Sequence, residues 1–157
     1  MMIAMSDVLV VCALACTGLY AGYMLAFRSG VMPAFRELPD DRFTEAMSVI
    51  NRKVPGPLFL LLFLGSVALP AASWLTAPDS QGGQGQLLRL AATGCALVGH
   101  LTTAVGNVPL NNALEASLGR GDQHAAREAF ESRWNTFHTW RTACAVAAFL
   151  LMAASVL

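Results

Sequence analysis

The chain has 157 residues, of which 55% are hydrophobic and only 13% are charged, and its formal net charge at pH 7 is zero. Soluble domains carry about 25% charged residues, so a chain this short and this apolar could not bury its surface in water. The composition indicates an integral membrane protein, excludes a separate soluble catalytic domain, and lacks the basic surface that nucleic acid requires.

Four uncharged runs follow one another along the chain, at residues 8–27, 54–77, 90–114 and 142–157. A bilayer core is about 30 Å thick and needs about 20 helical residues, so the first three runs are long enough to cross it. The last run has only sixteen residues, so the fourth span has to begin earlier, near Trp134, which draws His138 and Arg141 into the membrane. We predict one domain of residues 1–157, an all-α antiparallel four-helix bundle with spans at about residues 8–28, 54–77, 89–114 and 134–157.

Small residues recur at four-residue spacing in the first span, at Gly18, Gly22, Ala26 and Gly30. Such spacing lets helices approach closely, either within the bundle or between two copies of the chain. Packing within the bundle is the favoured interpretation, and a homo-oligomer is the alternative.

The segments between the spans have patterns of their own. A short interfacial helix is predicted after the first span, capped by Asp40 or Asp41, with Phe43, Met47 and Ile50 on one apolar face. Residues 80–85 are rich in Gly and Gln and predict a flexible outer loop. Residues 123–133 predict a polar helical extension that leads into the fourth span.

Arginine and lysine are distributed unevenly among the connecting segments. Residues 28–53 hold five and residues 114–133 hold three, whereas residues 78–86 and 1–7 hold none. By the positive-inside rule, the first and third loops are cytoplasmic and both termini lie outside. We expect a multi-pass protein of the cell membrane, with its first span retained because residues 1–7 lack the basic start of a signal peptide.

The third span carries a polar stripe on an otherwise apolar helix. At 100° per residue, four side chains fall within about 60° of one another: His100, Thr103, Asn107 and Asn111. Pro109 opens the helical backbone near Val105, and the two asparagines bracket that break. The alternative role of the two asparagine amides is therefore to form hydrogen bonds with the backbone groups that Pro109 leaves unpaired.

The fourth span presents a second polar face, about 120° wide, which carries Trp134, Asn135, His138, Arg141 and Thr142. An arginine inside the membrane is costly in free energy unless it is paired, hydrated or part of a functional site. The alternative for Arg141 is that its long side chain snorkels to the membrane interface. The helical rise places Asn107, His138 and Arg141 at similar depths. The two polar faces are therefore expected to meet near the cytoplasmic mouth, where Tyr20 of the first span joins them.

The cysteines and histidines do not form a metal-binding pattern. The four cysteines lie inside the spans without a C-x-x-C pair, and buried cysteines usually behave as small hydrophobic residues. A redox pair of Cys12 and Cys16, one helical turn apart, is the alternative. His100 and His138 lie about 12 Å apart along the helix axes, whereas two ligands of one zinc ion each lie about 2.1 Å from it. We predict no metal site.

Motifs at four places along the chain belong together: Val31-Met32-Pro33-Ala34, Ile50-Asn51, Asn107-Val108-Pro109-Leu110-Asn111, and Trp134-Asn135 followed by His138 and Arg141-Thr142. They resemble the anthrone oxygenase-like family, also catalogued as domain of unknown function 1772. The resemblance covers nearly the whole chain and implies a small four-span membrane protein. The named members of that family act in aromatic polyketide pathways, where they oxidise an anthrone methylene to a quinone carbonyl with dioxygen.

These observations lead to one functional hypothesis, a membrane-embedded monooxygenase for a lipophilic aromatic substrate. An anthrone that loses a proton becomes an enolate that reacts with O2 directly, so O2 is the expected co-substrate and no cofactor is predicted. His138 is the expected base and Arg141 the expected stabiliser of the enolate oxygen. The expected substrate-binding residues are Asn107, Asn111, Trp134, Tyr20, Thr103 and His100.

Two alternatives stay open at this point. The first is a non-enzymatic membrane protein that binds or transports a small molecule or assists assembly. The second is a membrane oxidase that holds a haem or a metal through His100 or His138 singly. In each case the expected partners are the lipid bilayer and a small lipophilic molecule, and no nucleic acid.

Overall fold

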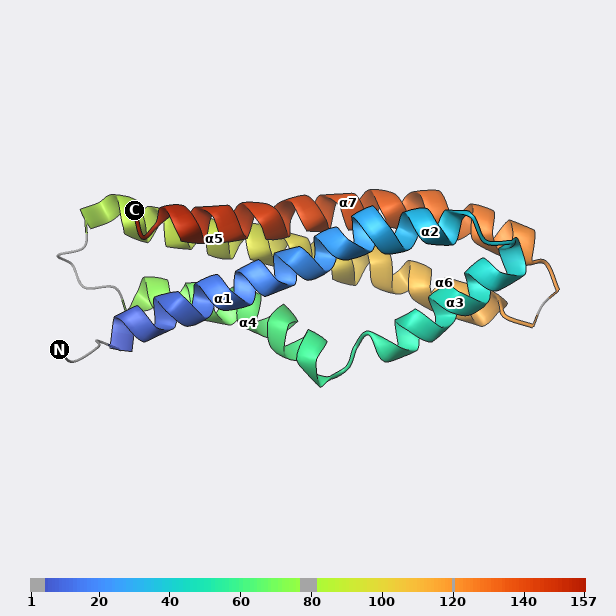
Figure 1. Ribbon diagram of the computed structural model, residues 1–157, viewed down its shortest axis with the longest axis horizontal. Helices are drawn as coiled ribbons and strands as arrows, with labels where there is room; N and C mark the ends of the chain where they lie inside the picture. The colour runs from blue at the N-terminus through green and yellow to red at the C-terminus, as the bar shows by residue number, and fades with distance from the viewer. Residues whose placement is uncertain (1–4, 77–81, 120) are drawn as a thin grey trace.

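The protein is an elongated bundle of helices, seen in a computed structural model that describes residues 5–76, 82–119 and 121–157 (Figure 1). Two short π-helical segments, η1 and η2, interrupt the α-helices. In chain order the elements are α1 (Met5–Ala26), η1 (Phe27–Val31), α2 (Met32–Arg36), α3 (Asp40–Lys53), α4 (Pro57–Leu75), α5 (Gly82–Thr102), η2 (Thr103–Asn107), α6 (Val108–Ser117) and α7 (Gln123–Ala154).

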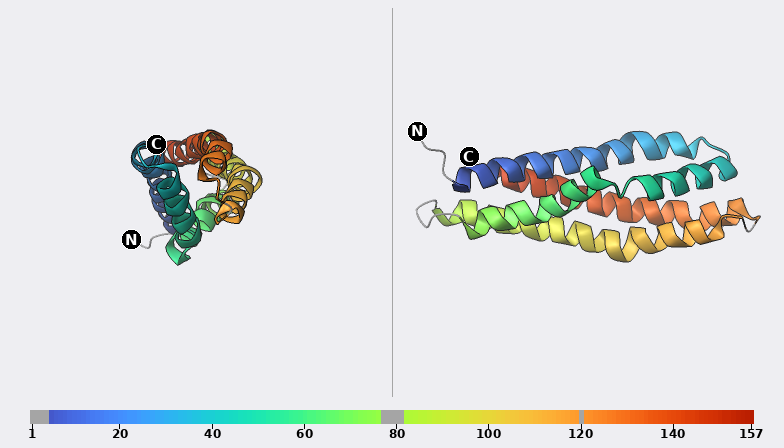
Figure 2. Two further views of the ribbon diagram at one scale, coloured as in Figure 1. Left: turned by 90° about the vertical axis from the view of Figure 1, so that its right-hand side faces the viewer. Right: turned by 90° about the horizontal axis from the view of Figure 1, so that it is seen from below.

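The helices form four antiparallel columns (Figure 2). The first column is α1–η1–α2, the second is α3 followed by α4, the third is α5–η2–α6, and the fourth is α7 alone. Around the bundle α1 packs on α4, α4 on α5, α5 on α7, and α7 on α1. The predicted all-α four-helix bundle is confirmed, and no strand occurs among the described residues.

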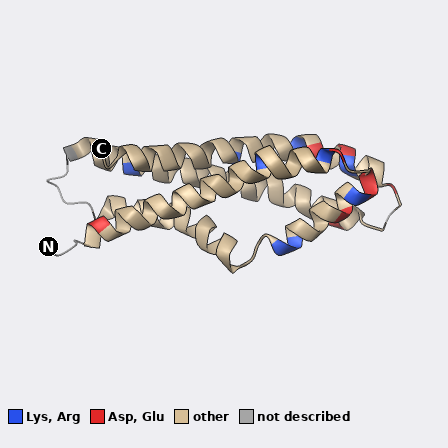
Figure 3. Cartoon of the chain, viewed as in Figure 1, with Lys and Arg blue, Asp and Glu red and all other residues tan. Residues whose placement is uncertain are grey.

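Four helices are long and apolar enough to cross a membrane: Met5–Arg36, Pro57–Leu75, Gly83–Ser117 and Gln123–Ala154. The protein is therefore a multi-pass membrane protein. Three of these helices extend beyond the predicted spans, because the backbone stays helical through the polar residues that follow or precede each apolar run. The predicted polar extension of residues 123–133 is confirmed as the first part of α7. Charged residues gather mainly at one end of the bundle, which we call the charged end (Figure 3).

Two expectations for the connecting segments need correction. Residues 82–85, expected in a flexible loop, instead begin α5, although three of the four are glycine, a poor helix former. The rest of that predicted loop lies outside the described residues. The predicted helix after the first span exists as α3, but its N-cap residue is Pro39 and no side chain caps it. Asp40 binds the side chains of α7 instead.

The apolar face of α3 belongs to the core of the bundle. Phe43 and Met47 are fully buried and pack in one cluster with Phe130 and Trp134 of α7. The column then breaks at Gly56, which is extended (φ −82°, ψ 173°), because Pro57 disfavours helical backbone at the residue before it. Between Lys53 and Pro57 the chain is not helical, and α4 starts afresh with a proline in its first turn. This break opens the side of the bundle.

Prolines also account for the two π-helical segments. Pro33 and Pro109 have no N–H to donate to the carbonyl four residues earlier. The helical hydrogen bonds there span five residues instead of four. The N–H of Met32 donates to Phe27 five residues back, and the N–H of Val108 donates to Thr103 in the same way. π-Helical turns are frequent at functional sites, and both of these border the cavity described below.

The small-residue stripe of α1 is divided between two environments. A Cβ atom built on Gly18 would lie 3.0 Å from the ring of Phe149, so Gly18 packs closely against α7. Gly22 and Gly30 have nothing within 4 Å. The stripe therefore serves packing within the bundle at Gly18, and a homo-oligomer through the remaining positions stays a prediction.

We expect Gly106→Ala to lower the stability of the bundle. A Cβ atom at Gly106 in η2 would lie 2.5 Å from Cγ of Phe137, and overpacking of this kind typically costs about 1–3 kcal/mol. The expected result is a lower apparent Tm in detergent. Gly22→Ala is the matched control, because its site is open and alanine favours a helix. An unchanged Tm for Gly106→Ala would show that Phe137 moves aside freely.

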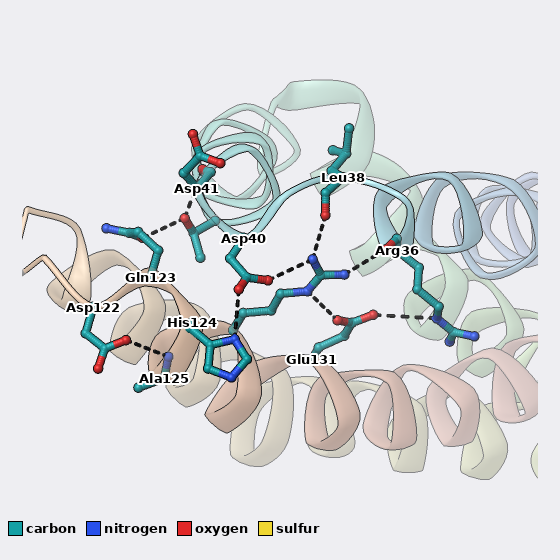
Figure 4. Close-up of polar contacts among 11 residues, drawn as sticks. Arg36, Leu38, Asp40, Asp41, Asp122, Gln123, His124, Ala125 and Glu131 are labelled. Atoms are coloured by element: carbon teal, nitrogen blue, oxygen red, sulfur yellow. Dashed lines mark hydrogen bonds and ion pairs between the residues drawn. The ribbon is translucent and has the colours of Figure 1, made fainter.

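At the charged end, Arg127 of α7 holds the loop between α2 and α3 through hydrogen bonds. Its partners Arg36, Leu38, Asp40 and Glu131 are labelled in Figure 4. Its guanidinium donates to the backbone oxygens of Leu38 (2.6 Å) and Arg36 (2.9 Å), and to the carboxylates of Asp40 (3.1 Å) and Glu131 (2.7 Å). Five donors in a rigid fork suit arginine to such a junction. These contacts hold α3, and with it one wall of the cavity, against α7.

Asp40 makes this junction sensitive to acid. The hydrogen bond from His124 and the charge of Arg127 hold the pKa of the Asp40 carboxyl below its usual value of 3.8. A lowered folded-state pKa means that the ionised carboxylate stabilises the fold above the usual pKa and that this contribution is lost as pH falls through the lowered value. We expect Asp40→Asn to have a lower Tm than wild type at pH 7 and an equal Tm below the folded pKa. Asp41→Asn is the control, because Asp41 forms only an exposed pair with Arg42; a difference between Asp40→Asn and wild type that persists in acid would contradict the assignment.

Candidate functional site

A cavity of about 110 Å³ lies inside the bundle beside the break between α3 and α4. Residues from every column line it. Its aromatic walls are Tyr23, Phe27, Phe59 and Trp134, and its polar groups are Asn51, Thr103, Asn111, His138 and Arg141. Pockets that bind small molecules are typically apolar with a few convergent polar groups, and this composition fits that description.

His138 and Arg141 form a hydrogen-bonded pair in the wall of the cavity. They lie three residues apart on α7, which places them on one face, and Nε of Arg141 donates to Nδ1 of His138 at 2.9 Å. Since Nδ1 accepts, Nε2 carries the proton of the neutral ring, and it faces the backbone oxygen of Met24 at 3.2 Å. Both ring nitrogens of His138 are thus engaged by the protein.

Arg141 is buried, with only 8% of its surface exposed. Nη1 reaches Oγ1 of Thr103 at 3.5 Å, and the guanidinium lies 5.2 Å from the ring centre of Trp134. Across the described parts of the chain no carboxylate forms an ion pair with it. The side chain therefore points inward instead of snorkelling, and it leaves a cation without a counter-anion in the cavity wall.

Trp134 joins the polar faces of the third and fourth columns. Nδ2 of Asn107 donates to the backbone oxygen of Trp134 at 3.2 Å, and Nε1 of Trp134 donates to Oδ1 of Asn111 at 2.8 Å. The ring of Trp134 stacks on His138 with 4.8 Å between centres. The predicted meeting of the two faces occurs, although the amides bind Trp134 and form no hydrogen bond with His138 or Arg141 within the residues described.

Those contacts also decide between the two roles considered for the asparagines. Asn107 and Asn111 do not patch the backbone opened by Pro109, because their amides are used on α7. The widened turn of η2 absorbs the missing N–H instead. Asn111 lines the cavity, whereas Asn107 is fully buried behind it.

His100 and Tyr20 lie away from this cavity. His100 is stacked on Phe63 with 3.7 Å between ring centres, and its nitrogens face the backbone oxygens of Ala96 (2.8 Å) and Phe63 (2.5 Å). Tyr20 packs against the same two rings. Both residues border a smaller space of about 10 Å³ on the other side of Arg141. They contact the site through Arg141 and do not line the cavity itself.

Several cavity residues were not identified from the sequence. In the sequence, Tyr23, Phe27 and Phe59 cannot be distinguished from other apolar residues of a span. Whether they face the cavity depends on η1 and on the break before α4. Asn51 belongs to the Ile50-Asn51 motif, and its position as the last amide side chain before the second span is a signal from which it could have been predicted as a site residue. Its side chain reaches the cavity only because α3 continues the second column of the bundle.

An apolar groove of about 400 Å³ adjoins the cavity on the side of the bundle. It shares four lining residues with the cavity, Tyr23, Ile50, Val54 and Phe59. Lys53 and Pro57 stand at its rim, so the groove follows the break between α3 and α4.

The described residues contain no group of three or more His, Cys, Asp or Glu side chains placed to hold a metal ion. The four cysteines are unpaired. The Sγ of Cys16 donates to the backbone oxygen of Leu62 at 3.5 Å, so this thiol has a packing role between α1 and α4.

Together these features define a class: a four-span membrane protein with an aromatic cavity and a buried histidine–arginine pair within the spans. The chain belongs to the anthrone oxygenase family, which it matches over residues 46–151, and this range is 106 of the 157 residues. It contains the cavity residues of α3, α4, α5–η2–α6 and α7, whereas those of α1 and η1 precede it. No curated protein matches the chain, and no solved structure does.

Proposed function

We propose that the protein is a membrane-embedded monooxygenase that oxidises an activated methylene of a lipophilic, polyketide-type aromatic substrate to a carbonyl with O2. The observation that carries this proposal is the cation of Arg141, which is buried in the wall of an aromatic cavity and forms no ion pair with any carboxylate of the described residues. An uncompensated charge inside a membrane is costly and marks a functional site by default. An aromatic substrate that becomes an anion during its reaction would supply the missing charge.

The proposed chemistry balances without an external reductant. The substrate methylene loses a proton, and its electrons move onto the ring oxygen to give an enolate. The carbanion carbon of that enolate combines with O2, and protonation gives a hydroperoxide. Loss of the second C–H proton with cleavage of the O–O bond then yields the carbonyl and water. One oxygen atom enters the product and the other enters water, so we propose no cofactor.

In this proposal Arg141 stabilises negative charge and His138 accepts the proton. Arg141 stabilises the enolate oxygen, because a preorganised cation in a dry site acts strongly on developing charge. In the structure the Nε–H of Arg141 donates to the lone pair of His138 Nδ1. When the substrate oxygen attracts the guanidinium, Nδ1 is released and takes the methylene proton. The base thus becomes available only when a substrate is bound.

The cavity has to widen for a tricyclic substrate. Its 110 Å³ is below the about 300–1,000 Å³ typical of ligand pockets. The adjoining groove supplies the additional space, because the two share Tyr23, Ile50, Val54 and Phe59. We propose that the substrate enters from the membrane along this groove, between α1 and the start of α4.

We propose further that the charged end of the bundle is cytoplasmic and that both termini lie outside. Thr76→Cys and Glu128→Cys, both at exposed positions, should then react with a membrane-impermeant thiol reagent from opposite sides of intact cells. Wild type reports the background from its native cysteines. Labelling of both variants from the same side would contradict the four-span orientation.

The function is tested with purified protein, an anthrone and an oxygen electrode. We expect one O2 consumed for each quinone formed, at a rate well above that of the same detergent or lipid without protein. Metal analysis and an absorbance spectrum of the active preparation test the absence of a cofactor, since stoichiometric iron, copper or a haem band would contradict it. A rate equal to the protein-free control with a panel of anthrones would overturn the assignment.

One observation favours a second candidate, a non-enzymatic binding protein. Both ring nitrogens of His138 contact other protein groups, which suits a binding pocket as well as a base that substrate binding releases. A binding protein would take up a quinone and the corresponding anthrone with similar affinity and would leave the rate of oxidation at the protein-free value.

A further inference from the structure

Asn51 presents an unused hydrogen-bond donor at the cavity. Its Nδ2 atom is buried and has no partner among the described residues, and the residue lines the cavity. The hydroxyl of Tyr20 and Oδ1 of Asn107 share this condition, but neither residue lines the cavity. Asn51 is therefore the one residue of the three whose unpaired atom a bound molecule would meet.

The surroundings of Asn51 are fixed by its own helix. The neighbouring Ser48 and Arg52 both bind Glu115 of α6, so this end of α3 is held to the third column. Asn51 takes no part in that network and does not cap the helix, whose C-cap is Val54. A buried donor without a hydrogen-bond partner is costly, and a ligand oxygen would satisfy Nδ2 of Asn51.

We infer that Asn51 donates from Nδ2 to a second oxygen of the bound substrate, distinct from the oxygen held by Arg141. This inference rests on the proposed function and narrows its substrate class. A neutral amide donor suits a carbonyl or phenol oxygen, whereas the guanidinium of Arg141 suits the enolate. The two residues come from different helices, α3 and α7, and line the same cavity. The site therefore selects flat aromatic molecules that carry an additional oxygen beside the reacting ring.

Binding of two quinones tests the inference without requiring turnover. The probes are unsubstituted anthraquinone and 1,8-dihydroxyanthraquinone, and the readout is quenching of tryptophan fluorescence, since Trp134 lines the cavity. One neutral hydrogen bond contributes about 1 kcal/mol, or roughly fivefold in Kd. We expect wild type to prefer the dihydroxy compound by about that factor, and Asn51→Leu to lose the preference while keeping its affinity for anthraquinone.

Two further variants complete the test. Asn51→Ala removes the donor without adding an acceptor or bulk, so it should lose the preference even where Asn51→Leu folds poorly. Asn112→Leu, at an exposed position of α6, should bind both probes as wild type does. The inference is overturned if both Asn51 variants keep the preference, or if wild type shows none.

The same measurements separate this inference from the proposed function. Wild type that oxidises an anthrone while the Asn51 variants retain the preference would refute only the role of Asn51. Wild type that shows the Asn51-dependent preference but leaves the rate of anthrone oxidation unchanged would support the binding site and refute the enzyme.

Discussion

Arg141→Lys is expected to lower kcat for anthrone oxidation by about 10²–10³-fold, the usual loss when one donor to a developing oxyanion is removed. Lysine keeps the positive charge but lacks the planar fork. It cannot donate to His138 and Thr103 from the fixed positions that Arg141 Nε and Nη1 occupy. The measurement is kcat in detergent with the protein-free rate subtracted.

The matched control is Arg133→Lys, an exposed arginine two turns earlier on α7. It should keep the wild-type kcat, because it has no place in the cavity. If Arg141→Lys oxidised the anthrone at the wild-type rate, any positive charge in the cavity wall would be enough for catalysis. The geometry of the guanidinium would then have no role.

His138→Gln is the second change with a large expected effect. An amide oxygen can still accept from Nε of Arg141, so the cation should keep its position and quinone binding should survive. The amide cannot take a proton, and loss of a general base typically costs about 10²–10⁴-fold in rate. We therefore expect quinone binding as in wild type together with a loss of kcat in that range.

His124→Gln is the control for this prediction, since His124 is an exposed residue of the charged end. It should leave kcat unchanged. A His138→Gln variant with wild-type kcat would show that the methylene proton goes elsewhere, and the role of His138 would then be to hold Arg141.

The spans and the inward position of His138 and Arg141 could be predicted from the sequence. The uncharged runs give the number of helices, and the shortness of the last run places both residues inside the membrane. That argument needs only the thickness of a bilayer and the rise of a helix. The family motif at residues 107–111 supports the same region, and the match over residues 46–151 confirms the family.

The partners of the polar residues could not be predicted in the same way. A uniform 100° per residue places His100 on the stripe of Asn107 and Asn111, but η2 adds one residue to a turn between them. The phase of the helix therefore changes, and His100 turns toward Phe63 instead of the cavity. On α1, Tyr20 lies a turn before the cavity wall, where Tyr23 stands instead.

The position of Asn51 depends on long-range structure. A helix was expected after the first span, but the sequence does not indicate that α3 runs along the bundle and packs on α7 and α6. That placement follows from Arg127 holding the α2–α3 loop and from Glu115 binding Arg52. Pairings between residues so distant in sequence leave no local pattern, so a single sequence does not indicate them.

In the proposed function, buried Arg141 stabilises an aromatic oxyanion in the cavity. The most direct test is an absorbance titration of a hydroxyanthraquinone, whose phenol changes colour on ionisation, bound to wild type and to Arg141→Met. We predict that ionisation of the bound phenol occurs at lower pH in wild type than in the free compound, and that Arg141→Met removes this shift. An unshifted ionisation in wild type, with the compound bound, would contradict the claim.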